Sequence, residues 1–430
     1  MRISPTTAEI AIVSFEGPDR YSTVGGLATR VTDLAPALVA RGYRVTHVFV
    51  GDTGLPDRQT RLDGRLRLRR WCQWISRYHP RDVYDGEWGK WRDFSASVPP
   101  FLLESLIAPA HARGRRVVLL FEDWQTAEAA MLTAETGYVR GLTRACVPLW
   151  NANNTYGCWN VDFGRLALTT QVTTVSRWMR SELQQFGVRD AVVVPNGVAE
   201  WMLAPVLPDD LQEIHHAKDD RLLFLKVARF DPDKRWLNAV DAVATLKERG
   251  HRVRFLFRGG TSPYRDEVLG RIDARGLTRG TLRLGVEATA PEFAKALAEQ
   301  RQDAVLLDFF LPERLLRALY AAADGVLANS EREPFGLVGL EVMGAGGIAY
   351  VGATGEDYAQ PLMNCVVIRT DDPREIAEAA ALLGERPEVT RRIRLEGRET
   401  ARRYSWTSVI EDMELVWEVA AERAFSGMRG

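Results

Sequence analysis

The sequence lacks the features that would place it in several specialised classes of protein. Its four cysteines, Cys72, Cys146, Cys158 and Cys365, have neither the spacing of metal ligands nor that of a disulfide framework. Lys and Arg total 56 against 57 Asp and Glu, so no excess of positive charge attracts nucleic acid or acidic lipid. No segment approaches the roughly 18 uninterrupted apolar residues of a membrane span, and no basic region followed by an apolar run opens the chain. We therefore expect a cytoplasmic protein with no nucleic-acid partner and no membrane span.

The length and the pattern of elements predict two α/β domains. A chain of 430 residues exceeds what one hydrophobic core usually supports. Short β-rich runs alternate with helical segments, first from residue 10 and again from residue 222, which is typical of parallel sheets. Residues 204–221, with two prolines and Asp-Asp pairs, interrupt the pattern, so we place the domains at 1–203 and 204–405. The expected architecture is two doubly wound, Rossmann-like domains facing a cleft, with ligands beyond the carboxyl ends of the strands.

The most informative stretch is residues 331–347, which contain two glutamates around a Pro-Phe-Gly turn. Glu333 and Glu341 offer carboxylates to sugar hydroxyls, while the helix start after Gly336 offers free N–H groups to a phosphate. A glycosidase would need two carboxylates roughly 5–9.5 Å apart. A continuous helix would separate these two by about 12 Å, which favours two roles on one ligand. The structural alternative is a solvated Glu333 and a Glu341 that pairs on its own helix.

Two cations follow the strand that opens the second half. Arg229 and Lys234 leave its carboxyl end, where they would neutralise a diphosphate whose charge grows as a sugar bond breaks. The alternative is that both are ordinary solvated side chains. Asp231-Pro232-Asp233 between them indicates a charged turn rather than a pair of metal ligands.

Two strand ends in the first half carry candidate residues. Gly25 and Gly26 precede the first helix, where they favour close approach of an anion, although a purely structural turn fits equally well. They do not form the three-glycine dinucleotide fingerprint, so a nicotinamide cofactor is not expected. Glu122 and Asp123 end another strand and would project into the cleft. The alternative for Asp123 is an N-cap of the next helix.

Aromatic residues gather in two segments of the first half. Residues 71–91 hold six of them and residues 150–159 combine two tryptophans with three asparagines. Flat apolar faces with polar rims suit stacking on sugar rings, but we expect most of the first group to pack in the core or at an interface. Asn196-Gly197, after Pro195, reads as a turn that closes the first domain. The six aromatics of the first segment are Trp71, Trp74, Tyr78, Tyr84, Trp88 and Trp91.

Taken together in this order, the motifs resemble those of a known family. The chain resembles the retaining GT-B glycosyltransferases of the glycogen-synthase and sucrose-synthase-like group, and the matching residues span nearly its whole length. They are Gly25-Gly26-Leu27-Ala28, Asp123-Trp124-Gln125-Thr126-Ala127, Val175-Ser176, Val194-Pro195-Asn196-Gly197-Val198, Ala228-Arg229-Phe230 with Lys234, Leu319-Tyr320-Ala321-Ala322-Ala323-Asp324, Glu333-Pro334-Phe335-Gly336-Leu337 with Glu341, and Tyr404-Ser405-Trp406.

The resemblance implies a donor site and a final helix. A nucleoside-diphosphate sugar would bind mainly to the C-terminal domain and the acceptor to the N-terminal one, with no metal ion and no further cofactor. Residues 406–430 would form a helix that crosses back onto the N-terminal domain. The implied catalytic residues are Glu333, Arg229, Lys234, Glu122 and Asp123. The implied donor-binding residues are Gly25, Gly26, Asn196, Arg229, Lys234, Glu333 on the sugar, Phe335, Gly336, Leu337, Val338, and Glu341 on the ribose.

Some positions depart from the pattern of the family. Glu122 stands where relatives carry a histidine beside the reacting sugar, and we hypothesise that it replaces the histidine's hydrogen bond to the donor. Thr23 stands where glycogen synthases carry a lysine, and residues 344–347 lack a proline found in relatives. The favoured function is a retaining transfer of a hexose, with glucose favoured, to a carbohydrate or polyol acceptor. The alternatives are a catalytically silent sugar-nucleotide-binding protein or a GT-B epimerase.

Overall fold

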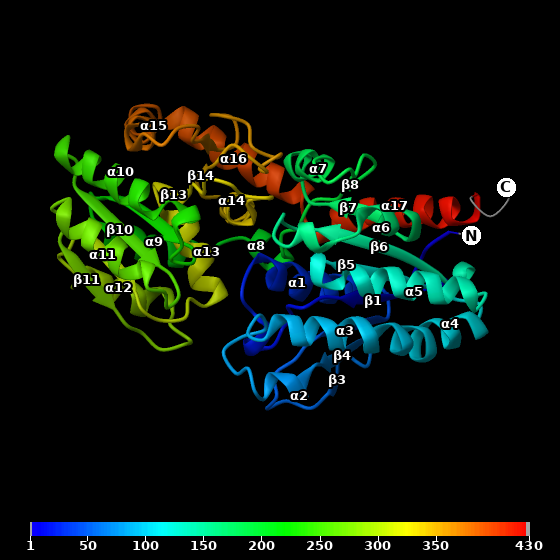
Figure 1. Ribbon diagram of the computed structural model, residues 1–430. Helices are drawn as coiled ribbons and strands as arrows, with labels where there is room; N and C mark the ends of the chain where they lie inside the picture. Colours follow the sequence, from blue (N-terminus) through cyan, green and yellow to red (C-terminus); the bar gives the residue numbers. More distant parts are fainter. Residues whose placement is uncertain (1, 427–430) are drawn as a thin grey trace. The chain divides into compact units, whose positions relative to one another are not determined.

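The computed structural model describes residues 2–426 and divides into two compact units (Figure 1). The first contains the chain up to Gly197 and again from Trp406, and the second is Val198–Ser405. The division therefore lies between Gly197 and Val198 rather than between Leu203 and Ala204. Residues 204–221 are also less irregular than expected, because Pro208 starts a helix, α9 (Pro208–Lys218), whose first turn carries two aspartates.

The first unit is built on an eight-stranded sheet in the order β3-β4-β2-β1-β5-β6-β7-β8. Only β3 and β4 pair in the antiparallel sense; the other neighbours are parallel, as the alternating pattern predicts. The inner strands are apolar and buried on both faces, which parallel sheets covered by helices require. The strands are β1 Ala8–Val13, β2 Val45–Val50, β3 Arg58–Arg61, β4 Leu66–Trp71, β5 Arg116–Glu122, β6 Cys146–Ala152, β7 Gln171–Thr174 and β8 Val192–Val193.

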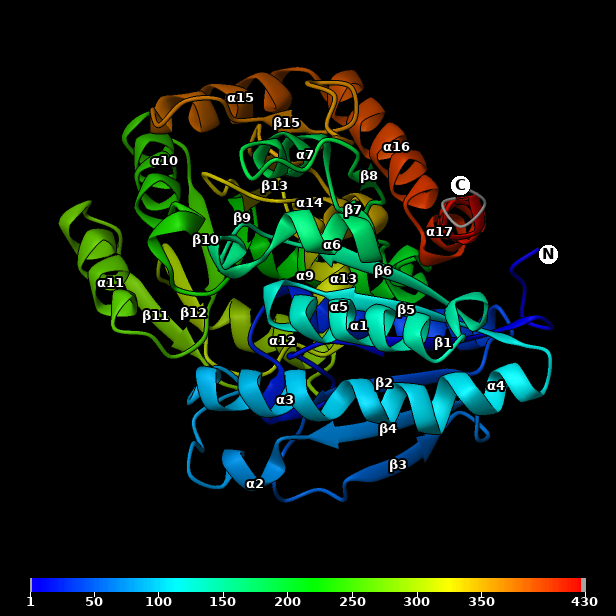
Figure 2. The same ribbon diagram turned by 45° about the vertical axis from the view of Figure 1, so that its right-hand side comes forward.

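Helices cover both faces of this sheet. In Figure 2, α3 and α4 run as one rod past β2 and β4, joined by a π-helical segment that follows Pro99 and Pro100. The principal helices are α1 Gly26–Ala40, α2 Gln73–Ser76, α3 Glu87–Phe101, the π segment Leu102–Ile107, α4 Ala108–Ala112, α5 Ala127–Val139, α6 Phe163–Thr169 and α7 Arg177–Gln184.

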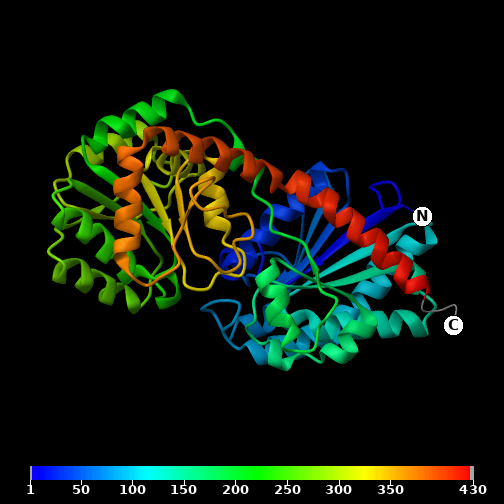
Figure 3. The same cartoon turned by 90° about the horizontal axis from the view of Figure 1, so that it is seen from above.

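The last helix, α17 (Trp406–Ser426), belongs to the first unit although it follows the second in sequence. Figure 3 shows it in red beside the blue and cyan strands. Trp406 and Trp417 are each 1% exposed and lie in one hydrophobic core with α1 and the sheet. The apolar stripe of this helix therefore faces the first unit, and the expected crossing back of the chain is confirmed.

The second unit is a seven-stranded parallel sheet in the order β11-β12-β10-β9-β13-β14-β15. The chain moves from β9 to β10, passes to the edge strand β11 and comes back to place β12 between them. It then adds β13 on the other side of β9, so the strand order reverses there. The strands are β9 Leu222–Val227, β10 Val253–Arg258, β11 Arg279–Leu282, β12 Ala304–Leu307, β13 Gly325–Ala328, β14 Ala349–Val351 and β15 Val366–Val367. The helices, besides α9, are α8 Glu200–Leu203, α10 Trp236–Glu248, α11 Tyr264–Ala274, α12 Ala290–Ala298, α13 Glu313–Ala322, α14 Leu337–Gly344, α15 Pro373–Glu385 and α16 Pro387–Arg403.

Both units are thus doubly wound α/β folds, and the predicted fold class is confirmed. None of the helices within residues 2–426 has both the length and the apolar character that a membrane span requires.

Candidate functional site

The strand-order reversal of the second unit brings two predicted residues together. Lys234 follows β9 and Glu333 follows the neighbouring strand β13, so both leave the same edge of the sheet. The Lys234 Nζ lies 2.7 Å from Glu333 Oε2, and the two side chains are 21% and 23% exposed. A cation and a carboxylate are therefore paired at the surface position where open parallel sheets bind ligands.

The segment between Arg229 and Lys234 is a capped turn. The Asp231 carboxylate accepts the N–H of Asp233 at 3.0 Å, which is the charged turn expected from the sequence. The Trp236 indole N–H donates to the Arg229 carbonyl at 2.7 Å and fixes the start of the turn. The Arg229 side chain is exposed and forms no ion pair within residues 2–426, so its guanidinium is open to an anion.

The loop that carries Glu333 is held by a segment that the sequence analysis missed. The Glu333 N–H donates to Thr354 Oγ1 at 2.8 Å, and the Gly355 N–H donates to the Glu333 carbonyl at 2.9 Å. Beside them Glu356 is 6% exposed, and burial raises the pKa of its carboxyl to about 7. The sequence contained a signal for this segment, because Gly352 and Gly355 follow a buried strand, as the loops that carry Lys234 and Glu333 do.

Helix α14 begins directly after this loop. Gly336 precedes it with φ +77°, and its carbonyl accepts the Tyr358 hydroxyl at 2.5 Å. The N–H groups of Leu337 and Val338 stand in the first turn, where a helix offers them to an anion. Glu341 lies further along the helix. Burial of Tyr320 raises the pKa of its hydroxyl, and the negative charge of Glu341 acts in the same direction.

Phe335 has a different surrounding from the one expected. It is 3% exposed, and its ring lies 5.9 Å from that of Tyr358 and 6.1 Å from that of Tyr404. An aromatic side chain this deeply packed fixes the loop rather than a ligand. In this structure Phe335 packs inside the second unit, against Tyr358 and Tyr404.

A buried lysine that the sequence analysis also missed ties the two strands together. Lys226 in β9 is 1% exposed, and its Nζ donates to Asn329 Oδ1 at 2.7 Å and to the Leu327 carbonyl at 2.9 Å. Burial, followed by the charge of Lys234, lowers its pKa to about 7. Lys226 is the one charged residue in the otherwise apolar strand β9, and this pattern in the sequence could have predicted that it binds a neighbouring strand.

In the first unit, Glu122 is engaged inside the protein. It is 1% exposed, and its oxygens accept from Arg30 Nε at 3.1 and 3.2 Å, from Asn151 at 2.9 Å and from Asn153 at 2.8 Å. Arg30 in turn donates to Asn196 Oδ1 at 2.5 Å. This geometry disagrees with the expected hydrogen bond from Glu122 to a sugar, because four donor contacts from three side chains already occupy its oxygens.

Asp123 stands at the N-cap position of a short 3₁₀ helix, Trp124–Thr126, as one interpretation predicted. Its side chain makes no capping bond; it accepts the Asn153 N–H at 2.7 Å and the Asn154 amide at 3.0 Å. The backbone has φ +62°, a conformation that is strained for an aspartate. Burial raises the pKa of the carboxyl to about 7, despite these donors.

The glycine turn before α1 is already occupied by a carboxylate of the chain. Glu16 Oε2 accepts the N–H groups of Gly25 at 2.9 Å and Ala28 at 3.0 Å, while Tyr84 donates to Oε1 at 2.5 Å. In this conformation the Gly25 amide donates to Glu16, so the phosphate contact implied for Gly25 stays a prediction that requires this bond to break. Gly26 is exposed, with open space where a Cβ would stand.

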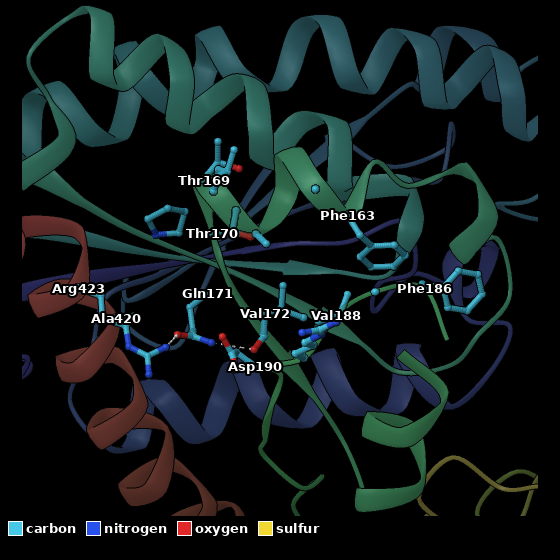
Figure 4. Close-up of a pocket in the computed structure, with 16 residues that line it drawn as sticks. Phe163, Thr169, Thr170, Gln171, Val172, Phe186, Val188, Asp190, Ala420 and Arg423 are labelled. Atoms are coloured by element: carbon cyan, nitrogen blue, oxygen red, sulfur yellow. Dashed lines mark hydrogen bonds between the residues drawn. The ribbon is translucent and has the colours of Figure 1, made fainter. Parts of the chain in front are cut away.

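A separate cavity of about 680 Å³ lies in the first unit (Figure 4). It is lined at the start of β7, between Phe163 and Phe186, whose ring centroids are 5.6 Å apart. Figure 4 shows Arg423 reaching Gln171, to which it donates at 3.0 Å. None of the predicted site residues lines this cavity, and it lies at the amino end of a strand, opposite the edge where ligands of such sheets bind.

The chain is similar to glycosyltransferases in sequence. Residues 209–400, within the second unit, match the family model described as "Glycosyl transferases group 1". EpsD of Bacillus subtilis (strain 168), which is named provisionally as a glycosyltransferase, is 25% identical over 236 residues; the match covers 54% of this chain and only 55% of EpsD. The uncharacterized glycosyltransferase MJ1607 of Methanocaldococcus jannaschii is 22% identical over 433 residues, covering 96% of this chain and 99% of that protein.

The fold is similar to that of solved glycosyltransferases. The catalytic domain of starch synthase IV from Arabidopsis thaliana superposes with a TM-score of 0.67 at 16% identity, covering 97% of this chain and 99% of that one. Sucrose-phosphate synthase from Thermosynechococcus elongatus gives 0.65 at 17% identity, covering 95% and 98%. At such low identity these likenesses show the fold alone, which is the GT-B class expected from the sequence.

Proposed function

We propose that this chain, whose residues 209–400 match the glycosyltransferase group 1 family model, is a retaining hexosyltransferase. It would move a hexose, with glucose favoured, from a nucleoside-diphosphate sugar to a carbohydrate or polyol acceptor. One observation carries the proposal: Lys234 and Glu333 meet at 2.7 Å where the strand order of the second unit reverses, next to the start of α14. The solved starch synthase with the same fold holds ADP and acarbose, which supports this class of ligands.

In the proposed donor complex each residue has one task. Arg229 and Lys234 bind the diphosphate, with the amides of Leu337 and Val338 donating to its oxygens. Glu333 accepts hydrogen bonds from the sugar hydroxyls, and Glu341 binds the ribose. Lys234 exchanges its contact with Glu333 for the phosphate, so that the carboxylate becomes available to the sugar.

The proposed chemistry is a displacement at the anomeric carbon with retained configuration. The bond between this carbon and the diphosphate oxygen breaks while its bond to the acceptor oxygen forms on the same face. The proton of the acceptor passes to the departing phosphate oxygen. Negative charge therefore grows on the diphosphate, where two cations and a helix start stabilise it without a metal ion in the proposed scheme.

Release of nucleoside diphosphate tests this proposal. The chain is incubated with UDP-glucose, ADP-glucose or GDP-mannose and a panel of sugar acceptors. We expect acceptor-dependent release that falls at least about 100-fold in Lys234→Ala and in Glu333→Gln. Lys247→Ala is the matched control. Lys247 forms a comparable ion pair with Asp303 in the same unit, but it lies in the last turn of α10, at the opposite end of this helix from Lys234.

Two outcomes would contradict the proposal. Turnover that is unchanged in both site variants would show that the pair has no part in transfer. Donor binding without release with any acceptor would favour the catalytically silent alternative.

A further inference from the structure

Several large aromatic side chains of the first unit are exposed, and one of them, Trp88, belongs to the group at 71–91 of which we expected most to pack in the core or at an interface. Trp88, Tyr156 and Trp159 are 58%, 57% and 67% exposed. They come from two segments that are far apart in sequence, at the start of α3 and after β6. Exposed aromatic groups of this size usually mark a surface that another molecule covers.

Trp124 joins the two segments into one surface. Its ring lies 5.4 Å from that of Trp88 and 6.4 Å from that of Trp91. On its other side Gly157 packs so closely that an added Cβ would stand 2.2 Å from the Trp124 ring. Gly157 sits between Tyr156 and Trp159, whose rings are 5.8 Å apart. We call these five aromatic residues the aromatic platform: the exposed Trp88, Tyr156 and Trp159, together with the half-buried Trp91 and with Trp124, which is 4% exposed.

A carboxylate lies within the aromatic platform. Glu87 accepts from Gln125 at 2.8 Å and from the Tyr156 hydroxyl at 3.4 Å, so it links both segments. Asp82 in the preceding loop adds negative charge near Glu87, whereas the charge of Asp85 is paired with Arg81 at 3.0 Å. Acidic groups beside exposed rings disfavour an anionic lipid or a phosphorylated ligand, since like charges repel.

The position of the aromatic platform within the unit favours a ligand. Trp124 follows β5 directly and Tyr156 follows β6 within a few residues, so the platform lies at the carboxyl ends of these strands. Ligands of doubly wound sheets bind at this edge. Aromatic faces pack against the C–H faces of sugar rings, while carboxylates and amides bind the hydroxyls around them.

We propose that the aromatic platform binds a neutral oligosaccharide, and that the acceptor of the proposed transfer is such a chain rather than a single sugar or a polyol. The claim that the bound oligosaccharide is the acceptor rests on the proposed function. The claim that the aromatic platform binds an oligosaccharide does not. Several exposed rings can stack on several successive sugar units, which a polyol cannot offer.

Binding without donor tests the inference separately from the transfer. The full chain is titrated calorimetrically with maltohexaose, cellohexaose and mannohexaose, and in separate cells with UDP, ADP and GDP. We expect at least one hexasaccharide to bind with a Kd below about 1 mM and to lose about 10-fold in affinity in Trp88→Ala and in Trp159→Ala. Trp74→Ala is the matched control, because Trp74 is 61% exposed on α2, outside the aromatic platform.

The outcomes separate the two proposals. Loss of hexasaccharide binding with unchanged nucleotide binding in both platform variants supports the inference. The inference is overturned if no hexasaccharide binds, if both variants bind as the wild type does, or if sedimentation shows a dimer that Trp88→Ala dissociates. Absence of nucleotide binding in the wild type would instead count against the proposed transferase and leave the platform result standing.

Discussion

The contact between Lys234 and Glu333 makes two substitutions differ in sign. In the free protein the carboxylate holds the ammonium at 2.7 Å and competes with a phosphate for it. Lys234→Ala removes the cation, so we expect the affinity for free nucleoside diphosphate to fall about 10- to 100-fold. Glu333→Gln removes the competitor, so affinity for the sugar-free nucleotide should stay equal or rise while transfer falls. Isothermal titration of each variant with UDP, ADP and GDP measures this, and equal losses in both variants would contradict it.

Asp123 should give the stability of the first unit a pH dependence. Burial raises its pKa from 3.8 to about 7, and the charges of Glu122 and Glu16 act in the same direction. The unfolded chain therefore releases this proton first, and stability is lost as pH rises from about 4 to about 7. The side chain of the Asp123→Asn variant cannot ionise. The free energy of unfolding of this variant, relative to that of the wild type, should therefore climb across this range by at most about 1.4 kcal/mol per pH unit, and its thermal midpoint should climb with it.

The trend with pH, rather than the absolute midpoint, is the measurement for Asp123. The new amide would face the Asn154 amide that now donates to the carboxylate, which costs the same at every pH. Asp63→Asn, in the exposed turn between β3 and β4, is the control. Parallel pH profiles for Asp123→Asn and the wild type would contradict the raised pKa.

At this scale the sequence predicts contacts only where geometry is local to neighbouring strands. The resemblance implied one donor site for Lys234 and Glu333, and the structure brings them together at the ends of two neighbouring strands. The partner of Glu122 could not be predicted, because Arg30 lies 92 positions away on a helix and nothing in its local pattern distinguishes it. The same holds for Glu16, whose contact with the glycine turn depends on the path of the chain between β1 and α1.

Among the elements, α14 depends on one glycine. At Gly336 a Cβ would lie 2.6 Å from Glu356 Cγ and 2.9 Å from the Tyr358 hydroxyl, and φ is +77°. We expect Gly336→Ala to destabilise the second unit by about 1–3 kcal/mol and to weaken nucleotide binding, because the helix start would shift. Thermal unfolding and nucleotide titration measure the two effects.

A glycine within another helix of the same unit supplies the control. Gly270 in α11 has open space where a Cβ would stand, so Gly270→Ala should be neutral or stabilise by about 0.5–1 kcal/mol. Equal behaviour of the two variants would show that Gly336 is not constrained in the way described.

The elements themselves were largely predictable, and the exceptions have physical causes. The alternation of strands and helices in both units was readable from the sequence pattern, and the final helix was implied by the resemblance. Residues 204–221 were misread because prolines and aspartates also start helices, as Pro208 does in α9. Of the six aromatic residues of 71–91, Trp74, Tyr78 and Trp88 are exposed, because composition does not tell which face of an element points to solvent.

For the whole molecule, α17 should govern the stability of one unit only. Trp417 is 1% exposed and packs edge-on against Tyr43 at 5.9 Å. Trp417→Ala should cost the first unit about 3–5 kcal/mol and leave the second unchanged. Leu415→Ala, at an exposed position of the same helix, should change stability by less than about 0.5 kcal/mol.

Nucleotide binding assigns the unfolding transitions to the units. A nucleoside diphosphate at about 100 times its Kd should stabilise the unit that binds it by about 2.7 kcal/mol. By calorimetry we expect two transitions, of which UDP, ADP or GDP raises only the one that Trp417→Ala leaves in place. A nucleotide that raises the transition lowered by Trp417→Ala would place the donor site in the wrong unit.

The second unit is an insertion between two pieces of the first, since the chain leaves at Gly197 and returns at Trp406. Val198 and Ser405 pair as an isolated bridge, so the outgoing and returning strands run side by side. A ribosome making this chain therefore finishes the inserted part before it supplies Trp406 and Trp417, which the earlier part needs to close its core. The portion translated first matures last, and until then its apolar surface must be shielded, either by its own partial folding or by a chaperone.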